Sequence, residues 1–197
     1  LTVEQAKKLL SSADAAGEPI YTAILLSIVY GLRRSEVCGL RRQDIDFDNG
    51  AMHICNTVVK GNMKYIEEKR TKTKKSDRVI ALVDSTVPHL KAHKDEQPAA
   101  GLTLDKVCRW PSGDDIKHDY ISKKFSKLLK ANNLPSIRYH DLKHPAASLL
   151  IASGVAPQQT REFLGHETVS TTMNIYAHCL NDAKIKTANL MNEIYSS

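Results

Sequence analysis

The chain lacks a paired-cysteine motif, a long hydrophobic run and an initiator methionine. Its four cysteines lie far apart with no Cys-x-x-Cys pair, which favours reduced, partly buried thiols in a cytosolic protein. The longest apolar run, 21–32, contains Thr22 and Ser27 and is too short to span a bilayer. No secretory segment is recognisable. We therefore expect a cytoplasmic protein without membrane attachment, and because the chain begins at Leu1, a fragment of something longer.

The composition is that of a soluble globular domain. Hydrophobic residues make up 42% of the 197 residues and charged residues 25%, which argues against disorder. This length is sufficient for a proper core, and no repeat or convincing domain boundary divides it. The formal net charge of +6 favours an anionic partner, with nucleic acid as the first candidate. An excess of lysine is also common on solvated surfaces.

Helical patterns dominate the chain. The capping-box pattern from Thr2 to Gln5 predicts a helix from the first residues to about Ala13. The nearly all-apolar segment 20–30 predicts a buried helix that Gly31 ends. Further helices are expected at 35–40, 84–94, around 121–129, at 141–153, 157–164 and 169–178, with an amphipathic tail. Strands are expected at 51–59, 63–71, 78–83 and 106–110. The pattern predicts an α+β fold, mostly helical, with a small three-stranded antiparallel sheet.

Arg33 lies in the turn between two of these expected helices. An arginine there can cap the end of the preceding helix. Its planar guanidinium is equally suited to bind two oxygens of one phosphate. Glu36, one helical turn later, is placed to hold it.

The segment 69–78 holds six basic residues and one acid between two expected strands. As a solvated hairpin it needs no function. As a phosphate-binding finger it would neutralise several backbone charges and make binding steeply dependent on salt. Composition leaves both interpretations open, although a lysine between two strands is held on a rigid support.

The C-terminal part of the sequence contains a group of histidines and a tyrosine. His140 and His144 share a helix face at i and i+4, and with His166 they match the ligand set of a zinc hydrolase, with Asp141 in place of the usual glutamate base. Asp141 is equally explained as a helix cap. Tyr176, one of seven tyrosines, is explained by packing when it is taken alone.

Taken together, five motifs in order resemble the catalytic domain of the tyrosine recombinases, the phage and transposon integrases. The resemblance covers nearly the whole chain, 1–197, and implies the DNA breaking-rejoining fold without the amino-terminal core-binding and arm-binding domains of the family. The motifs are Gly-Leu-Arg-Arg-Ser-Glu (31–36), Lys-Thr-Lys-Lys-Ser-Asp-Arg (72–78), His-Asp-Leu-Lys-His (140–144), Leu-Gly-His (164–166) and Asn-Ile-Tyr (174–176).

The resemblance implies a role for each motif in site-specific DNA recombination and integration. Tyr176 would attack the scissile phosphate and form a 3′-phosphotyrosyl link. Arg33 would bind the phosphate, His140 and His166 would hydrogen-bond it and assist proton transfer, and Lys72 would be the general acid. The other implied residues are two supporting acids and four basic DNA-contacting residues, of which Lys74 is also the alternative general acid: Glu36, Asp141, Arg34, Arg70, Lys74 and Lys75.

The sequence departs from the family pattern at Lys143, where a second arginine would complete the phosphate clamp. Lysine keeps the charge but loses the second, parallel hydrogen bond, which costs roughly 3–4 kcal/mol of transition-state stabilisation. Pro145 after His144 is a second departure, because proline restricts the residue before it. We expect slow cleavage. The alternatives are a DNA-binding module with impaired catalysis and, less favoured, the zinc hydrolase.

The resemblance also implies the partners. Double-stranded DNA is the expected substrate, and no cofactor or metal is expected because the phosphotyrosine conserves the bond energy. A tetramer assembled on DNA is implied for the full-length protein, with the terminal helix docking on a neighbour, although this fragment alone is compatible with a monomer. The resemblance is also compatible with an accessory directionality factor as a partner. It implies that this protein is encoded by a bacterium or phage and is associated with the nucleoid.

Overall fold

A computed structural model describes residues 1–61, 65–69, 77–95, 105–165, 172–177, 185, 189–191 and 193–194. Its helices are α1 (Val3–Ala15), α2 (Ile20–Val29), α3 (Arg34–Gly39), α4 (Val87–Asp95), α5 (His118–Ala131), α6 (Lys143–Ala152) and α7 (Pro157–Leu164). Short 3-10 turns are η1 (Arg42–Asp44), η2 (Asp84–Thr86) and η3 (Tyr139–Leu142). The strands are β1 (Ile45–Asp46), β2 (Ala51–Ile54), β3 (Asn56–Lys60), β4 (Tyr65–Lys69) and β5 (Arg78–Ala81). The expected mostly helical α+β fold is confirmed.

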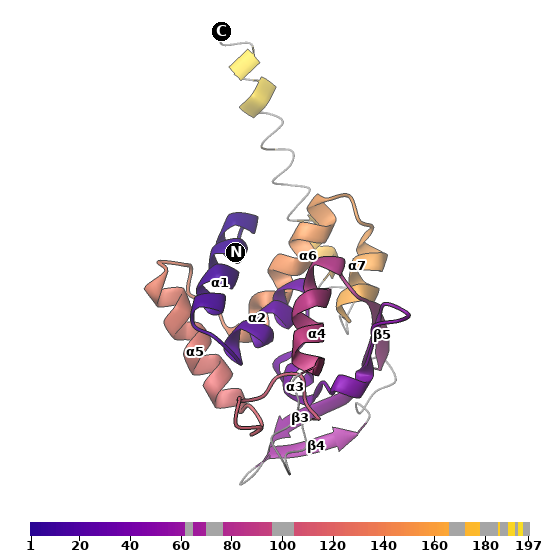
Figure 1. The fold of residues 1–197 in the computed structure, drawn as a ribbon. Coiled ribbons are helices and arrows are strands. Elements are labelled where there is room, and N and C mark those ends of the chain that lie inside the picture. Colours follow the sequence, from indigo (N-terminus) through magenta and orange to yellow (C-terminus); the bar gives the residue numbers. More distant parts are fainter. Residues whose placement is uncertain are drawn as a thin grey trace.

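Helix α2 forms the centre of the core. Eight of its ten residues are buried, and it contacts α1, α3, α5 and α6. Figure 1 shows α1 and α5 on one side of the molecule, α6 and α7 above, and the strands on the opposite, lower side. The apolar sequence of α2 explains this position, because a helix that is hydrophobic all round must be covered on every face.

The sheet differs from the expected one. The expected strand 51–59 is divided at Cys55 into β2 and β3, which belong to different sheets. One sheet has the order β1-β2-β5 and the other pairs β3 with β4, all antiparallel. The polar residues at the break explain it: the Asp44 carboxylate accepts a hydrogen bond from Asn56 Nδ2 at 3.0 Å and one from Cys55 Sγ at 3.7 Å, which draws the chain away from β5.

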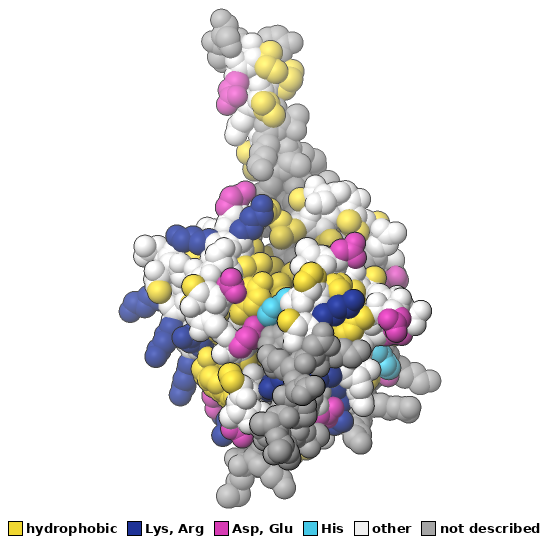
Figure 2. All heavy atoms as spheres, in the orientation of Figure 1, with side chains coloured by type: hydrophobic (Ala, Val, Ile, Leu, Met, Phe, Trp, Pro, Cys, Tyr) yellow, Lys and Arg dark blue, Asp and Glu magenta, His cyan; other side chains and the backbone are white. Residues whose placement is uncertain are grey.

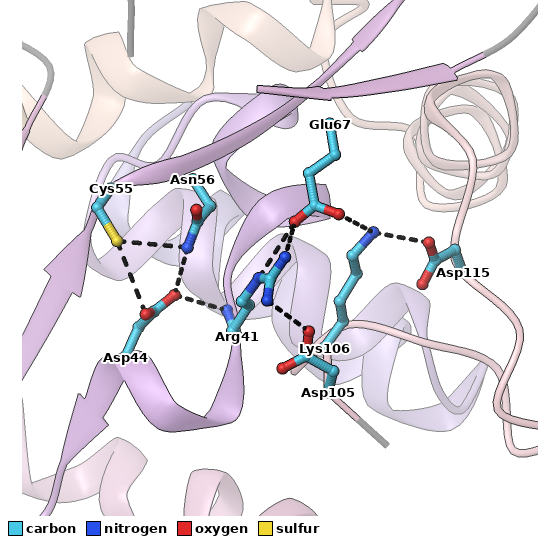
Figure 3. A network of polar contacts seen from close by, with 8 residues as sticks. All are labelled: Arg41, Asp44, Cys55, Asn56, Glu67, Asp105, Lys106 and Asp115. Atoms are coloured by element: carbon cyan, nitrogen blue, oxygen red, sulfur yellow. Dashed lines mark hydrogen bonds and ion pairs between the residues drawn. The ribbon is translucent and has the colours of Figure 1, made fainter. Parts of the chain in front are cut away.

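A network of ion pairs holds β4 against the rest of the domain (Figure 3). Glu67 of β4 accepts a hydrogen bond from Arg41 Nε at 3.1 Å, and Lys106 Nζ lies 3.9 Å from Glu67 and 2.6 Å from Asp115. The expected strand at 106–110 is wrong: this segment makes only isolated bridges, Arg41 with Lys106 and Arg109 with Asp115. Lys106 belongs to the charge network and Val107 and Cys108 are buried in the core, and the backbone of the segment does not join a sheet.

Candidate functional site

The turn after α2 places Arg33 at the start of α3. Gly31 adopts φ +63°, a left-handed conformation that glycine adopts without steric cost. Arg33 is then the extended residue that precedes α3. Its backbone N–H donates to Glu36 Oε2 at 2.7 Å and its Nη1 donates to Glu36 Oε1 at 3.0 Å. Glu36 therefore contacts both the backbone and the guanidinium of Arg33.

Glu36 is a buried carboxylate shared by two arginines. Its side chain is 1% exposed, and besides Arg33 it accepts two hydrogen bonds from Arg78, at 3.0 and 3.2 Å. Burial by itself raises the pKa of Glu36, but the positive charges of Arg78 and Lys143 and the hydrogen bonds bring that pKa below its ordinary value. Glu36 is consequently an anion that is compensated from several sides.

The end of α7 meets the same turn. Gly165 follows α7 in a left-handed conformation, the usual way to end a helix, and its carbonyl accepts a hydrogen bond from Arg33 Nη2 at 3.2 Å. Leu164 is fully buried against Gly31, where a Cβ would lie 3.3 Å from the Leu164 Cβ and would overlap its Cδ2. Two glycines far apart in sequence thus allow α7 to approach Arg33.

The turn η3 presents His140. Asp141 accepts hydrogen bonds from the backbone N–H of Arg138 at 3.2 Å and from its Nε at 3.0 Å, so it holds the start of the turn rather than capping a later helix. Tyr139 donates its hydroxyl to the Ala23 carbonyl at 2.6 Å, which anchors η3 on α2. His140 itself has an exposed surface. Partial desolvation of its imidazole by neighbouring residues, followed by the charges of Lys143 and Arg33, lowers its pKa.

Arg33 and His140 line one hollow of about 680 Å³. One wall comes from the start of α3, another from α5, and the third from η3 and the residues before it. Hydrogen-bonding and basic side chains predominate in its lining, which consists of Arg33, Arg34, Ser35, His118, Ser122, Phe125, Ser126, Ser136, Ile137, Arg138, Tyr139 and His140. Such a surface suits an anionic group.

Lys143 starts α6 and is 5% exposed. Its charge reaches both Glu36 and His140, since it lowers the pKa of each. Within the described part of the chain it is not among the residues that line the hollow. The lysine is therefore a buried cation whose charge acts on the Glu36 carboxylate and on His140.

Tyr176 lies in a helical stretch, 172–177, as the expected helix 169–178 requires. Its neighbour Ile175 packs on the small apolar cluster of Ala146, Ala147 and Leu164. Thr172 is almost fully buried. The stretch thus packs on α6 and α7 of its own chain, and the Tyr176 side chain is half-buried.

Several expected site residues lie outside the described residues: Arg70, Lys72, Lys74, Lys75 and His166. The less favoured zinc site includes His166 and therefore stays a prediction. Within the described ranges alone, there is no group of three or more His, Cys, Asp or Glu side chains that could hold a metal ion. The described helices also include none that is long and apolar enough to cross a membrane.

Sequence reasoning missed Arg78 and the Gly165 carbonyl. Gly165 was recognisable as the glycine that follows a helix. Arg78 was recognisable only as the basic first residue of an expected strand, because its partner Glu36 lies 42 positions earlier.

Comparison with known proteins defines the class. The phage integrase family model matches residues 1–182. The chain belongs to the phage integrase family.

Named relatives refine this assignment. The chain is similar to a "Tyrosine recombinase XerC-like" protein of Caldanaerobacter subterraneus subsp. tengcongensis, with 29% identity over 98% of this chain and 53% of the relative. It is 28% identical to the transposase of transposon Tn916 from Enterococcus faecalis, over 98% of this chain and 51% of the relative. The chain thus spans about half the length of these curated relatives.

The fold is shared with solved structures. The Tn1549 transposon integrase in complex with circular intermediate DNA matches 96% of this chain and 66% of its own, with a TM-score of 0.77 and 23% identity. The XerA recombinase matches 95% and 64%, with a TM-score of 0.72 and 18% identity. At these identities the likeness concerns the fold.

Proposed function

We propose that this chain is a catalytic domain that breaks and rejoins strands of double-stranded DNA through a 3′-phosphotyrosyl intermediate. The observation that carries this proposal is the hollow shared by Arg33 and His140, which come from segments more than a hundred residues apart. Family membership and the Tn1549 integrase–DNA complex support the same substrate. The exposed lysines along α1 and α5, prominent in Figure 2, supply positive charge for phosphates at a distance from the hollow.

The reaction consists of two transesterifications. The Tyr176 phenol gives up its proton to His140 or His166 and attacks the scissile phosphorus, and the P–O bond to the 5′ oxygen breaks. Lys72 protonates this leaving oxygen, and a 5′ hydroxyl of a second strand later reverses the step. Phosphate bond energy is retained in the tyrosyl ester, so the exchange needs no external energy source.

Fixed cationic donors provide the catalysis. The pentacoordinate transition state carries more negative charge on its non-bridging oxygens than the ground state, so preorganised donors stabilise it selectively. Arg33, held on two sides by Glu36 and Gly165, fits this role. The lowered pKa of His140 keeps its imidazole neutral near pH 7, able to accept or donate a hydrogen bond. His166 would be the second histidine.

A second candidate function is DNA binding with little cleavage. The observation that favours it is that Lys143 is buried and does not line the hollow, at a position where the resemblance implies an arginine on the phosphate. We propose that cleavage is slow for this reason. The proposed catalytic domain also includes a supporting role for Asp141. DNA contacts are proposed for Arg34, Arg70, Lys74 and Lys75.

We also propose assembly of several copies on DNA. The described helical residues of the tail stand away from the body in Figure 1. Ile185, Leu190, Met191 and Ile194 of that tail are exposed. Apolar side chains presented in this way are suited to a neighbouring copy.

A covalent trap tests the function. A bound site is first selected from a random DNA library, and a nicked suicide duplex of that site is then incubated with the protein. We expect a covalent protein–DNA species that Tyr176→Phe abolishes and that the control Tyr21→Phe, also half-buried, retains. A species that survives Tyr176→Phe means another nucleophile. Salt-sensitive binding without any covalent species after long incubation selects the second candidate function.

A further inference from the structure

Arg78 has no role in the chemistry above, yet its guanidinium is enclosed beside Arg33. It is the first residue of β5, and its side chain is 9% exposed. Nη1 and Nη2 each donate to a different oxygen of Glu36, the bidentate geometry that guanidinium and carboxylate groups favour. Burying a charge in this way has a large desolvation cost, which a surface residue of a β-strand would avoid.

Glu36 divides its charge between the two arginines. Oε1 accepts from Nη1 of both guanidinium groups, and Oε2 accepts from the Arg33 backbone and from Arg78. Two cations and one anion leave a net charge of +1 on this group of three. Without Arg78 the net charge of the remaining pair is zero, and the carboxylate loses one of the two guanidinium groups that are hydrogen-bonded to it in the described part of the chain.

Gly165 closes the arrangement. A Cβ at this position would lie 2.6 Å from Arg78 Cζ and 2.7 Å from its Nε, so the glycine backbone rests directly on the Arg78 guanidinium. The carbonyl of the same residue accepts the hydrogen bond from Arg33 Nη2. Arg78 therefore supports both groups that hold Arg33, namely the Glu36 carboxylate and the Gly165 carbonyl.

We infer that Arg78 is a positioning residue for Arg33, acting through Glu36 and Gly165, and that it keeps the Arg33 charge available for a DNA phosphate. This inference rests on the phosphate-binding role of Arg33 proposed above. Arg78 need not touch the DNA. It acts by binding Glu36, so that the carboxylate neither neutralises the charge of Arg33 nor occupies the N–H donors of Arg33 that would bind a phosphate. Arg78, a buried arginine at the start of β5, thus contributes to catalysis without touching the DNA.

The first test separates binding from the chemical step. For Arg78→Met we expect the rate of single-turnover covalent complex formation at saturating DNA to fall roughly tenfold, which is less than the roughly 100- to 1,000-fold loss for a removed transition-state donor. The Kd for DNA should change little. Arg78→Lys keeps the charge and should retain most of the rate. The matched control is Arg41→Met, which removes an arginine paired with Glu67 and Asp105 away from the hollow.

A rescue experiment distinguishes positioning from packing. If Arg78 compensates Glu36, then Glu36→Gln in the Arg78→Met background removes the anion that Arg33 would otherwise neutralise, and it should raise the cleavage rate above that of Arg78→Met alone. If Arg78 serves only the packing of β5, the second substitution should lower the rate further. Cleavage by Arg78→Met within about twofold of the parent rate, with a loss of Tm like that of Arg41→Met, overturns the inference.

A measurement without DNA distinguishes a failure of the inference from a failure of the proposed function. The Arg33 Nε–Hε signal in ¹H–¹⁵N NMR spectra, assigned by its loss in Arg33→Lys, should shift in Arg78→Met and shift less in Arg78→Lys. Titration with inorganic vanadate then reports whether Arg33 still binds an oxyanion. An unchanged Arg33 signal and unchanged vanadate binding refute the positioning role, even if the parent protein cleaves DNA. Absence of cleavage by the parent protein, with the NMR shifts present, refutes only the proposed function.

Discussion

Gly31→Ala is expected to loosen the contact that brings α7 to the candidate site. The φ of Gly31 is +63°, and a methyl group added there would overlap the Leu164 side chain. The left-handed backbone costs an L-residue about 1–2 kcal/mol, and overpacking a buried contact adds about 1–3 kcal/mol. The free energy of unfolding should therefore fall by about 2–5 kcal/mol.

Gly50→Ala is the matched control. Gly50 has φ +61°, but a Cβ there would meet nothing within 4 Å, so only the backbone cost of about 1–2 kcal/mol is expected. Urea unfolding of both variants, followed by circular dichroism and by the fluorescence of the single tryptophan, measures the difference. In a Leu164→Ala background, Gly31→Ala should cost less than it does in the parent background, because the overlap with Cδ2 is removed and only the 3.3 Å contact with the Cβ remains. Equal losses for the two glycine variants in the parent background would mean that Leu164 does not lie on Gly31.

The other predictions concern the rate of cleavage and the dependence of stability on pH. Lys143→Arg should accelerate single-turnover cleavage by up to about 100- to 1,000-fold, because arginine can make a bidentate phosphate contact. The surface control Lys91→Arg should have no effect. Equal or slower cleavage by Lys143→Arg contradicts the explanation of slow activity. Burial, and then the charge of Arg34, lowers the pKa of His118 from 6.5, so the unfolded chain binds more protons than the folded protein below that pH. The free energy of unfolding should thus fall as pH drops from 6.5 towards the lowered pKa of His118 in the folded protein. Above pH 6.5, His118 should not contribute to the pH dependence. Urea unfolding at about pH 7.5 and about pH 5.5 should show a smaller loss for His118→Asn than for the parent, and the same loss in both would show that His118 is not responsible.

Much of the helical structure could be predicted because its causes are local. The capping box at Thr2, the apolar segment that became α2 and the boundaries of α7 all depend on residues within a few positions of one another. The order of the motifs likewise indicated the family, and Arg33 with Glu36 could be paired because they are one helical turn apart.

The tertiary structure decided the features that depend on distant residues. No local pattern divides 51–59 at Cys55, because the cause is the carboxylate of Asp44 reaching Asn56. No local pattern shows that Glu36 is shared with Arg78, or that Gly31 and Gly165 let α7 approach Arg33. Side-chain periodicity and capping act over a turn or two of chain, whereas burial of a charge and close backbone contact exist only after distant segments have packed together.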